Sequence, residues 1–334
     1  MGKGYVLGLD AGGTKTHCAL YNFKSGQLDL KTWGVGNHEG LPGGFEQLHK
    51  ELAANLVELI GRNNLAFSDI DMAVFGMGGV DTNEQHRIIS EMLKKIGVAR
   101  FILCNDAYLG VKAGAKSGCG ICAINGTGAS LAGIDDAGGR IQIGGFGEMS
   151  GDFGGASMLV TMAIGCVYNE LFRGHDKTSM TPAMMTLVGA ENRHDFMEKL
   201  TALLGSGYGA CILEICKILF GEAAKGDVIA TGLLEKSGKA YAQAAAGAVR
   251  ELAFKENKPI EIVLAGSLFT KGACKKQQET METLLPELLG GRDFVLTPLD
   301  TPCVAGAVLW ALDEIAVFGH REMVSKELKE MTEK

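Results

Sequence analysis

The chain has 334 residues, of which 46% are hydrophobic and 21% charged, and this composition predicts a globular protein large enough for two domains. Its net charge of −7, without a stripe of Lys and Arg, argues against a nucleic-acid-binding surface. No run reaches the ~18 apolar residues of a membrane span, and the N-terminus enters a strand without a signal-peptide pattern, so we expect a cytoplasmic protein with no membrane contact.

The first half of the chain predicts the element order βββαβαβα. Short apolar runs at 5–9, 17–21 and 28–33 are typical of strands, and apolar residues at helical spacing predict a helix over 43–61. The elements expected after them are a strand at 72–75, a helix at 84–96, a strand at 101–104 and a helix at 107–116.

The second half opens in the same way from residue 119. The expected elements are strands at 120–124, 129–132 and 140–143, a helix after 155, added helices over about 175–225, a helix at 227–255, a strand at 261–264, helices over 272–289, a strand at 294–296 and a terminal helix from about 305. The repeat predicts an α/β protein with two lobes and an interdomain cleft. We place the lobes at 1–116, to which the terminal helix 309–334 could belong, and at 117–308.

A glycine-rich turn occurs twice, each time between two short strands. The two copies are Asp10-Ala-Gly-Gly-Thr14 and Asn125-Gly-Thr-Gly-Ala129. Glycines let backbone N–H groups approach an anion, and threonine hydroxyls add donors. One such hairpin is more often structural, but two equivalent copies favour a polyphosphate clamp. The candidate phosphate-binding residues are Gly12, Gly13, Thr14, Gly126, Thr127 and Gly128.

Two aspartates follow strands at positions that suit phosphoryl transfer, which needs charge neutralisation and a carboxylate near the attacking hydroxyl. Asp10 at a strand end could hold Mg²⁺ through water, or it could cap the turn below it. Asp106 begins a helix after the strand 101–104 and could accept a proton from a bound hydroxyl. An N-cap role explains Asp106 equally well on sequence alone.

Five motifs in order carry a family resemblance. They are Asp10-Ala-Gly-Gly-Thr-Lys-Thr16, Asn105-Asp-Ala107, Asn125-Gly-Thr-Gly-Ala-Ser130, Gly144-Gly-Phe-Gly-Glu-Met-Ser-Gly-Asp152 and Leu264-Ala-Gly-Ser-Leu268. Together they resemble the N-acetylglucosamine kinase group of the BadF/BadG/BcrA/BcrD-type ATPases, within the actin, Hsp70 and hexokinase superfamily. The resemblance spans most of the chain. It implies a duplicated ribonuclease H-like fold, ATP with Mg²⁺ in the cleft, a sugar hydroxyl as phosphoryl acceptor and Asp106 as the catalytic base.

The resemblance also implies which residues hold the sugar and the adenosine, since a polyol is distinguished through its hydroxyls. The implied sugar-binding residues are Asn37, His38, Asp106, Thr127, Gly145, Phe146 and Asp152. Gly266 and Ser267 are expected against adenosine. A turn role for Asn37, a capping role for Asp152 and a plain strand-to-helix turn at 266–267 remain alternatives. Related animal kinases carry Trp where this chain has Phe146, which leaves the amino sugar open.

Rival motifs are missing from the sequence. It contains no P-loop pattern and no dinucleotide-binding G-x-G-x-x-G unit, and the Cys119/Cys122 pair has no second pair at zinc spacing. The nine cysteines, an odd number mostly in apolar runs, are typical of reduced core residues.

We therefore interpret the chain as an ATP-dependent kinase of an amino sugar of the N-acetylglucosamine, glucosamine or muramic acid type, acting at the 6-hydroxyl, with a homodimer left open. An alternative is an ATPase activator of a 2-hydroxyacyl-CoA dehydratase or benzoyl-CoA reductase, with an iron–sulfur cluster at a subunit interface. Cys119 or Cys166 would then be the cluster ligand, and the anaerobically purified protein would be brown. A sugar-sensing protein that has lost turnover is a third reading, against which an intact Asp106 argues.

Overall fold

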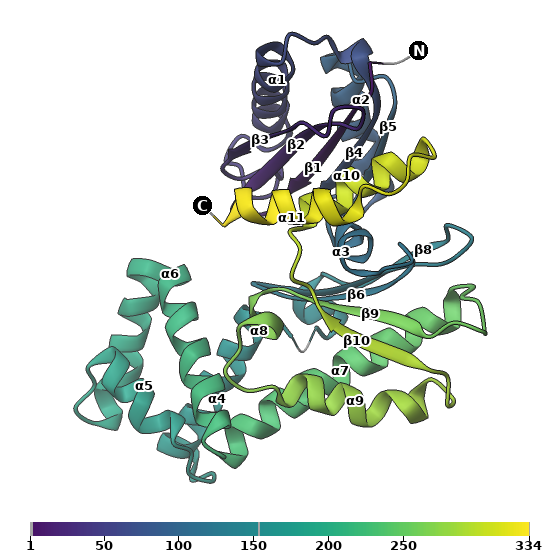
Figure 1. The fold of residues 1–334 in the computed structure, drawn as a ribbon. Helices are drawn as coiled ribbons and strands as arrows, with labels where there is room; N and C mark the ends of the chain where they lie inside the picture. The colour runs from purple at the N-terminus through teal and green to yellow at the C-terminus, as the bar shows by residue number, and fades with distance from the viewer. Residues whose placement is uncertain (1–2, 153, 334) are drawn as a thin grey trace. The chain divides into compact units, whose positions relative to one another are not determined.

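The computed structural model describes residues 3–152 and 154–333 and divides the chain into two compact units. Unit 1 comprises Met1–Cys122 and Leu299–Lys334, and unit 2 comprises Ala123–Pro298 (Figure 1). The sequence analysis placed the two boundaries after residues 116 and 308, whereas here they follow Cys122 and Pro298, and the terminal segment after Pro298 is part of unit 1. Among the described helices, none combines the length and apolar character that crossing a membrane requires.

Unit 1 is built on a mixed five-stranded sheet. Its strands are β1 (Tyr5–Ala11), β2 (Thr16–Asn22), β3 (Leu28–Trp33), β4 (Ile70–Met77) and β5 (Phe101–Cys104). They lie in the order β3-β2-β1-β4-β5, with β1 antiparallel to β2 and parallel to β4. The parallel pairing brings the end of β4 beside the end of β1, although about sixty residues separate them in sequence.

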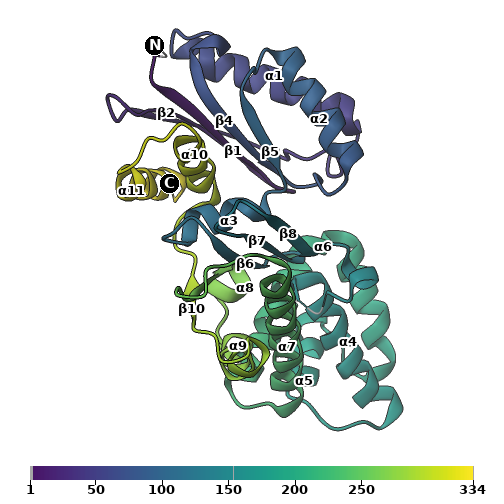
Figure 2. The ribbon, with the colours of Figure 1, turned by 90° about the vertical axis from the view of Figure 1, so that its right-hand side faces the viewer.

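Helices cover both faces of this sheet (Figures 1 and 2). They are α1 (Gly44–Arg62), α2 (Asn83–Ile96), α3 (Ala107–Gly114), α10 (Cys303–Glu314) and α11 (Arg321–Thr332), with a 3₁₀ turn at Phe67–Asp69. On one face, Leu48, Leu52 and Leu56 repeat at helical spacing along α1 and are buried against the sheet. On the other face, Gly8 has no side chain, so the backbone of Val308 in α10 packs directly on β1.

The predicted single terminal helix is two helices. The chain leaves α10 after Glu314, and Ala316 and Gly319 both adopt positive φ values of 55° and 88° before α11 begins. Two left-handed residues so close together cannot continue a right-handed helix. The apolar pattern runs across this break, which is why the sequence suggested one helix.

Unit 2 repeats the sheet of unit 1. Its strands are β6 (Gly120–Asn125), β7 (Ala129–Ile134), β8 (Arg140–Gly144), β9 (Ile260–Ala265) and β10 (Phe294–Pro298), in the order β10-β9-β6-β7-β8. When the strands of each unit are numbered from one to five along the chain, both sheets have the strand order 3-2-1-4-5. The antiparallel β7–β8 pair and the parallel β9–β10 pair match their counterparts in unit 1. The duplicated α/β fold predicted from the sequence is confirmed.

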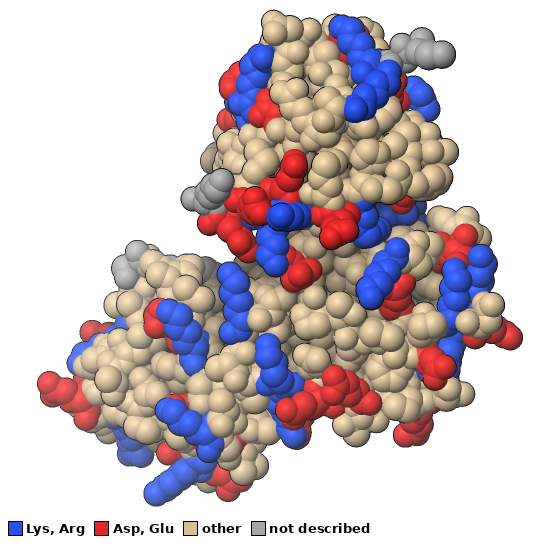
Figure 3. Space-filling model, in the orientation of Figure 1, with Lys and Arg blue, Asp and Glu red and all other residues tan. Residues whose placement is uncertain are grey.

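The helices of unit 2 form two groups. They are α4 (Ala156–Arg173), α5 (Met180–Val188), α6 (Arg193–Ala224), α7 (Val228–Glu251), α8 (Ser267–Thr270) and α9 (Lys276–Leu288), with a 3₁₀ turn at Gly147–Ser150. α4, α5 and α6 share one apolar cluster, and α5 and α6 occupy the segment expected as an insertion. α7 packs on β7 and β8, with α9 beside it (Figure 2). On the face drawn in Figure 3, acidic and basic side chains intermingle.

Candidate active site

The first glycine turn follows β1 and is closed by backbone hydrogen bonds. The N–H of Gly12 donates to the carbonyl of Lys15 (3.1 Å), and the carbonyl of Gly12 accepts the N–H of Gly36 (3.2 Å). In a trans peptide the N–H points opposite to the carbonyl, so the N–H of Gly13 faces away from Gly36. Thr14 beside it is exposed. The turn thus directs the N–H of Gly13 away from Gly36 and leaves Thr14 exposed, as an anion-binding turn requires.

The second glycine turn, in unit 2, has the same construction. The N–H of Gly126 donates to the carbonyl of Gly128 (3.1 Å). The first N–H groups of α4, from Ala156 and Ser157, donate to the carbonyls of Gly126 (2.8 Å) and Thr127 (3.1 Å). Because these carbonyls face α4, the N–H groups of Thr127 and Gly128 face the opposite side. The turn is therefore fixed on one side by the helix and presents donors on the other.

Two further glycines press against the second turn. A Cβ placed on Gly155 (φ +77°) would lie 2.5 Å from the backbone of Gly128, and a Cβ on Gly266 (φ +91°) would collide with the backbone of Asn125. Asn125 is fully buried, and its Oδ1 accepts the N–H of Gly155 (2.9 Å). These contacts bring Gly266, and with it Ser267, next to the second turn.

We expect Gly155→Ala to lower the free energy of unfolding by at least about 2 kcal/mol, since the positive φ and the contact with Gly128 both oppose a Cβ. The matched control is Gly165→Ala inside α4, the helix that Gly155 precedes, where a Cβ would meet open space; it should be neutral or stabilise by about 0.5–1 kcal/mol. Urea unfolding of both variants checks this. Equal effects of the two changes would mean that the second turn is not held by Gly155.

Asp10 and Asp106 are half-buried and lie close together in unit 1. Burial raises the pKa of Asp10 from 3.8 to about 7, and the charge of Asp106 adds to this rise. Burial, followed by the charge of Asp81, raises the pKa of Asp106 to about 6. The N–H of Ala107 at the start of α3 bonds to Oδ1 of Asn105 (2.9 Å). Asp106 is the N-cap residue of α3, but its side chain makes no capping hydrogen bond to this helix, which weakens the N-cap explanation of Asp106.

Asn37 lies beside the same carboxylate. A Cβ placed on Gly78 would lie 3.2 Å from Asn37 Nδ2 and 3.8 Å from Asp106 Oδ2, so the two side chains flank this glycine. Oδ1 of Asn37 accepts the N–H of Gly40 (2.7 Å), which fixes the loop and leaves the amide nitrogen directed toward Gly78. Asn37 therefore both stabilises its own turn and lies near Asp106.

His38 is fixed by stacking. Its ring lies 3.9 Å from that of Phe45, centroid to centroid, at 10° between the planes. A Cβ on Gly79 would lie 2.9 Å from the imidazole. Nδ1 of His38 is buried and has no hydrogen-bond partner within the described part of the chain. His38 therefore presents one polar atom that the protein itself does not satisfy.

Asp152 shapes the loop that follows β8. Its Oδ2 accepts the N–H groups of Gly145 and Gly147, each at 2.9 Å. This is the capping role that the sequence left open, and it occupies one of the two carboxylate oxygens. Phe146 on the same loop is 54% exposed, so it contributes little to the core.

The residues present fit a magnesium ion. Within 3–152 and 154–333, no group of three or more His, Cys, Asp and Glu side chains is placed to hold a metal by itself. Mg²⁺, however, keeps most of its waters and commonly binds through one or two carboxylates together with substrate phosphates. Asp10 and Asp106 supply two carboxylates whose mutual repulsion a cation would relieve.

The structure thus brings Asp10, Asp106 and Asn37 together in unit 1, and it places Gly266 at the second turn of unit 2. Sequence reasoning missed the segment after β4, where Gly78, Gly79 and Asp81 stand. Asp81 Oδ1 accepts a hydrogen bond from Asn105 Nδ2 (2.9 Å). The signal was a third glycine run, Gly76-Met-Gly-Gly79, directly after a predicted strand.

Residues 7–311 match the model of the BadF/BadG/BcrA/BcrD ATPase family. The chain belongs to this family. Membership confirms the resemblance carried by the five motifs. An N-acetylmuramic acid/N-acetylglucosamine kinase of Clostridium acetobutylicum is 24% identical to this BadF-type chain over 271 residues, which are 79% of the chain and 85% of the relative.

Solved structures share the fold of this family member. A candidate N-acetylglucosamine kinase from Chromobacterium violaceum is 21% identical with a TM-score of 0.62, over 91% of this chain and 98% of the other. A ROK family glucokinase from Streptomyces griseus, in complex with glucose and AMPPNP, is 16% identical with a TM-score of 0.52, over 92% of this chain and 98% of the other.

Proposed function

We propose that the protein is an ATP-dependent kinase that transfers the γ-phosphoryl group to the 6-hydroxyl of an amino sugar, N-acetylglucosamine or a close relative. The observation that carries the proposal is the half-buried Asp106, which has a pKa raised to about 6 and Asn37 beside it. A general base works best when its pKa is near the working pH. The C. acetobutylicum relative, named for this activity, supports the choice of substrate.

In this proposal Asp106 accepts the proton of the attacking hydroxyl as the new O–P bond forms and the bond to the ADP oxygen breaks. The outward N–H groups of Gly13, Thr127 and Gly128 stabilise phosphate oxygens. Asp10 holds Mg²⁺ through water, and the ion when bound neutralises charge on the phosphates. Asn37 orients a sugar hydroxyl. Gly266 and Ser267 lie against adenosine. ATP is the phosphoryl donor, and the enzyme acts in the cytoplasm.

The pH profile should depend on Asp81. Activity requires Asp106 as the carboxylate, so kcat/KM should fall as the pH drops below about 6 to 7, the range of the raised carboxyl pKa values. Asp81→Asn removes a negative charge that raises the pKa of Asp106, and the introduced amide keeps an acceptor for Asn105 Nδ2. The midpoint of the acid limb should move to lower pH. A midpoint that stays in place or rises would contradict Asp106 as the titrating base.

An ATP-to-ADP coupled assay across hexoses and amino sugars tests the proposed function. ADP release should depend on the sugar and be fastest with an amino sugar. Release that no sugar stimulates would overturn the proposal. Release stimulated most by a neutral hexose such as glucose would overturn the amino sugar assignment while leaving a sugar kinase.

A further inference from the structure

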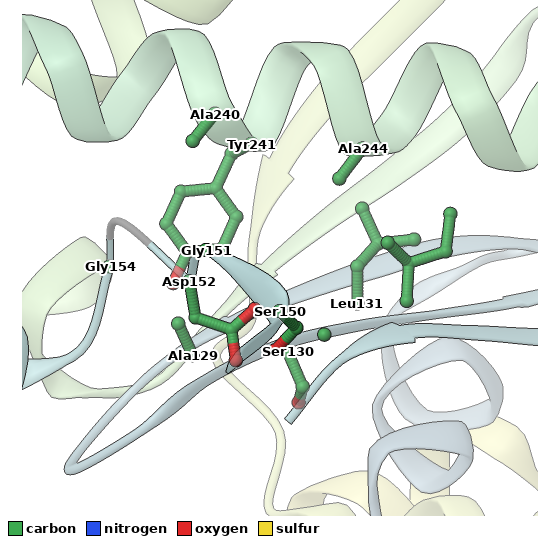
Figure 4. A pocket seen from close by; sticks show the side chains of 12 residues that line it. Ala129, Ser130, Leu131, Ser150, Gly151, Asp152, Gly154, Ala240, Tyr241 and Ala244 are labelled. Atoms are coloured by element: carbon green, nitrogen blue, oxygen red, sulfur yellow. The ribbon is translucent and has the colours of Figure 1, made fainter. Parts of the chain in front are cut away.

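His17 in unit 1 lies beside Asp10 but has no role in the candidate site described above. It belongs to β2, where it is paired directly with Asp10 of β1. Directly paired residues of antiparallel strands point to the same face of the sheet, with Cβ atoms about 4.5–5.5 Å apart. The two side chains are therefore close neighbours. The cavity beside Asp152 (Figure 4), by contrast, lies in unit 2 and belongs to the glycine-rich loop described above.

The row of paired residues that contains His17 crosses four strands. Its members on β3, β2, β1 and β4 are Thr32, His17, Asp10 and Gly76. A Cβ placed on Gly76 would collide with Leu109, so α3 covers this end of the row. On the other side of Asp10, β2 begins where the exposed first glycine turn ends. His17 therefore lies next to both the Asp10 carboxylate and the turn that we expect to hold phosphate.

The imidazole of His17 carries a polar atom that the chain does not satisfy. Its Nε2 is buried and has no hydrogen-bond partner within residues 3–152 and 154–333. Burial, followed by the positive charge of Lys15, lowers the pKa of His17 to about 4, so the ring is neutral near pH 7 and has one N–H group. Because a buried polar atom without a partner is costly, a ligand that supplies an acceptor at Nε2 removes this cost.

The groups around His17 suit an anionic oxygen. Lys15 lies close enough for its positive charge to act on the imidazole. The first glycine turn offers the N–H of Gly13 and the exposed Thr14. Backbone N–H groups, a lysine and an imidazole N–H are all donors, and phosphate oxygens are strong acceptors. Asp10 would repel an anion, but the Mg²⁺ that the proposed function assigns to it removes that repulsion.

We propose that His17 is a phosphate-binding residue, whose Nε2–H donates a hydrogen bond to a phosphate oxygen of the nucleotide at the first glycine turn. Nucleotide binding thus satisfies a donor that the free protein leaves without a partner. The bond adds affinity for the phosphate group, whereas in the free protein the same buried donor opposes stability. This inference rests on the proposed function, because it requires ATP and ADP to bind at this turn.

Calorimetric titration with Mg·ADP tests the inference in wild type, His17→Leu and His17→Gln. Leucine removes the donor and keeps much of the bulk, so Kd for ADP should rise roughly 10- to 100-fold, the loss expected for a hydrogen bond to a charged group. The glutamine amide can place an N–H near the position of Nε2, so His17→Gln should stay within about fivefold of wild type. The matched control is His86→Leu at an exposed position of α2, which should stay within about twofold.

The same titrations with EDTA in place of Mg²⁺ separate the phosphate from the hydrated ion as the partner of His17. The ratio of Kd between His17→Leu and wild type should persist without Mg²⁺, because the phosphate oxygen is still present. A ratio that falls to about one without Mg²⁺ would mean that His17 contacts a water of the ion, and it would overturn the inference.

Thermal unfolding without nucleotide separates a binding role of His17 from a structural one. His17→Leu should melt at or above the temperature of wild type, because it removes a buried atom that has no partner. His17→Ala should weaken ADP binding by a similar factor, and it keeps the inference open to contradiction if leucine does not fit. A melting temperature several degrees below wild type in both variants would mean a structural role.

The outcomes for ADP binding also separate this inference from the proposed function. An equal Kd in wild type and both apolar variants, or a loss that His17→Gln shares in full, would overturn the inference and leave the proposed function intact. Wild type that binds no ADP would overturn the proposed function instead, and this inference with it.

Discussion

Asp106→Asn is expected to lower kcat by roughly 10²- to 10⁴-fold while sugar binding persists, because the amide keeps the size of the side chain but cannot accept the proton. Removing the Asp106 charge also lowers the pKa of Asp10, since that charge adds to its raised value. Steady-state kinetics for turnover and calorimetry for sugar binding measure the two effects separately.

The control for this prediction is Asp300→Asn, which changes the same residue type at a side chain that is 81% exposed. It should leave kcat within about twofold of wild type. If Asp106→Asn kept turnover within threefold of wild type, Asp106 would not be the base. If sugar binding and turnover were lost together, the Asp106 carboxylate would have a structural role at the N-terminus of α3.

Asp10→Asn is expected to abolish most Mg·ATP-dependent turnover and at the same time to stabilise the free protein at pH 8. The folded-state pKa of Asp10 is raised to about 7 from 3.8, so its contribution to stability is present below pH 3.8 and is lost as the pH rises through 7. At pH 8 the buried charge opposes folding, and the amide removes it. Thermal unfolding without nucleotide should show a melting temperature several degrees above wild type at pH 8.

The gain from Asp10→Asn should shrink as the pH is lowered through 7 and should be nearly gone below pH 3.8, where the carboxyl group of wild type is mostly protonated in both states. A gain in stability that depends on pH in this way would show that the buried charge of Asp10 opposes folding, whereas a turn-capping Asp10 would stabilise the fold. A variant that is less stable than wild type at pH 8 would favour the turn-capping explanation of Asp10.

Much of the fold follows from local patterns. Short apolar runs around glycine turns predicted both β-hairpins, and leucines at helical spacing predicted α1, because each of these signals lies within one segment. The duplicated element order then predicted the two matching sheets. The end of α10 was missed because apolar residues continue past it, whereas the chain turns away through the positive φ values at Ala316 and Gly319.

The candidate site residues that the sequence predicts are those that lie within a recognisable local motif. Asp10, Asp106 and the two glycine turns lie in motifs that the sequence displays directly. Asp81 was missed because its effect on Asp106 depends on the parallel pairing of β1 with β4 and of β4 with β5, which brings distant segments to one edge.

The central claim is that phosphoryl transfer to an amino sugar takes place at Asp106. The most direct measurement incubates the protein with Mg·ATP and N-acetylglucosamine and identifies the products by phosphorus and proton NMR. We predict one sugar 6-phosphate formed for each ADP, and loss of both products with Asp106→Asn. ADP and inorganic phosphate without a phosphorylated sugar, or a sugar phosphate that forms equally well with Asp106→Asn, would contradict the account.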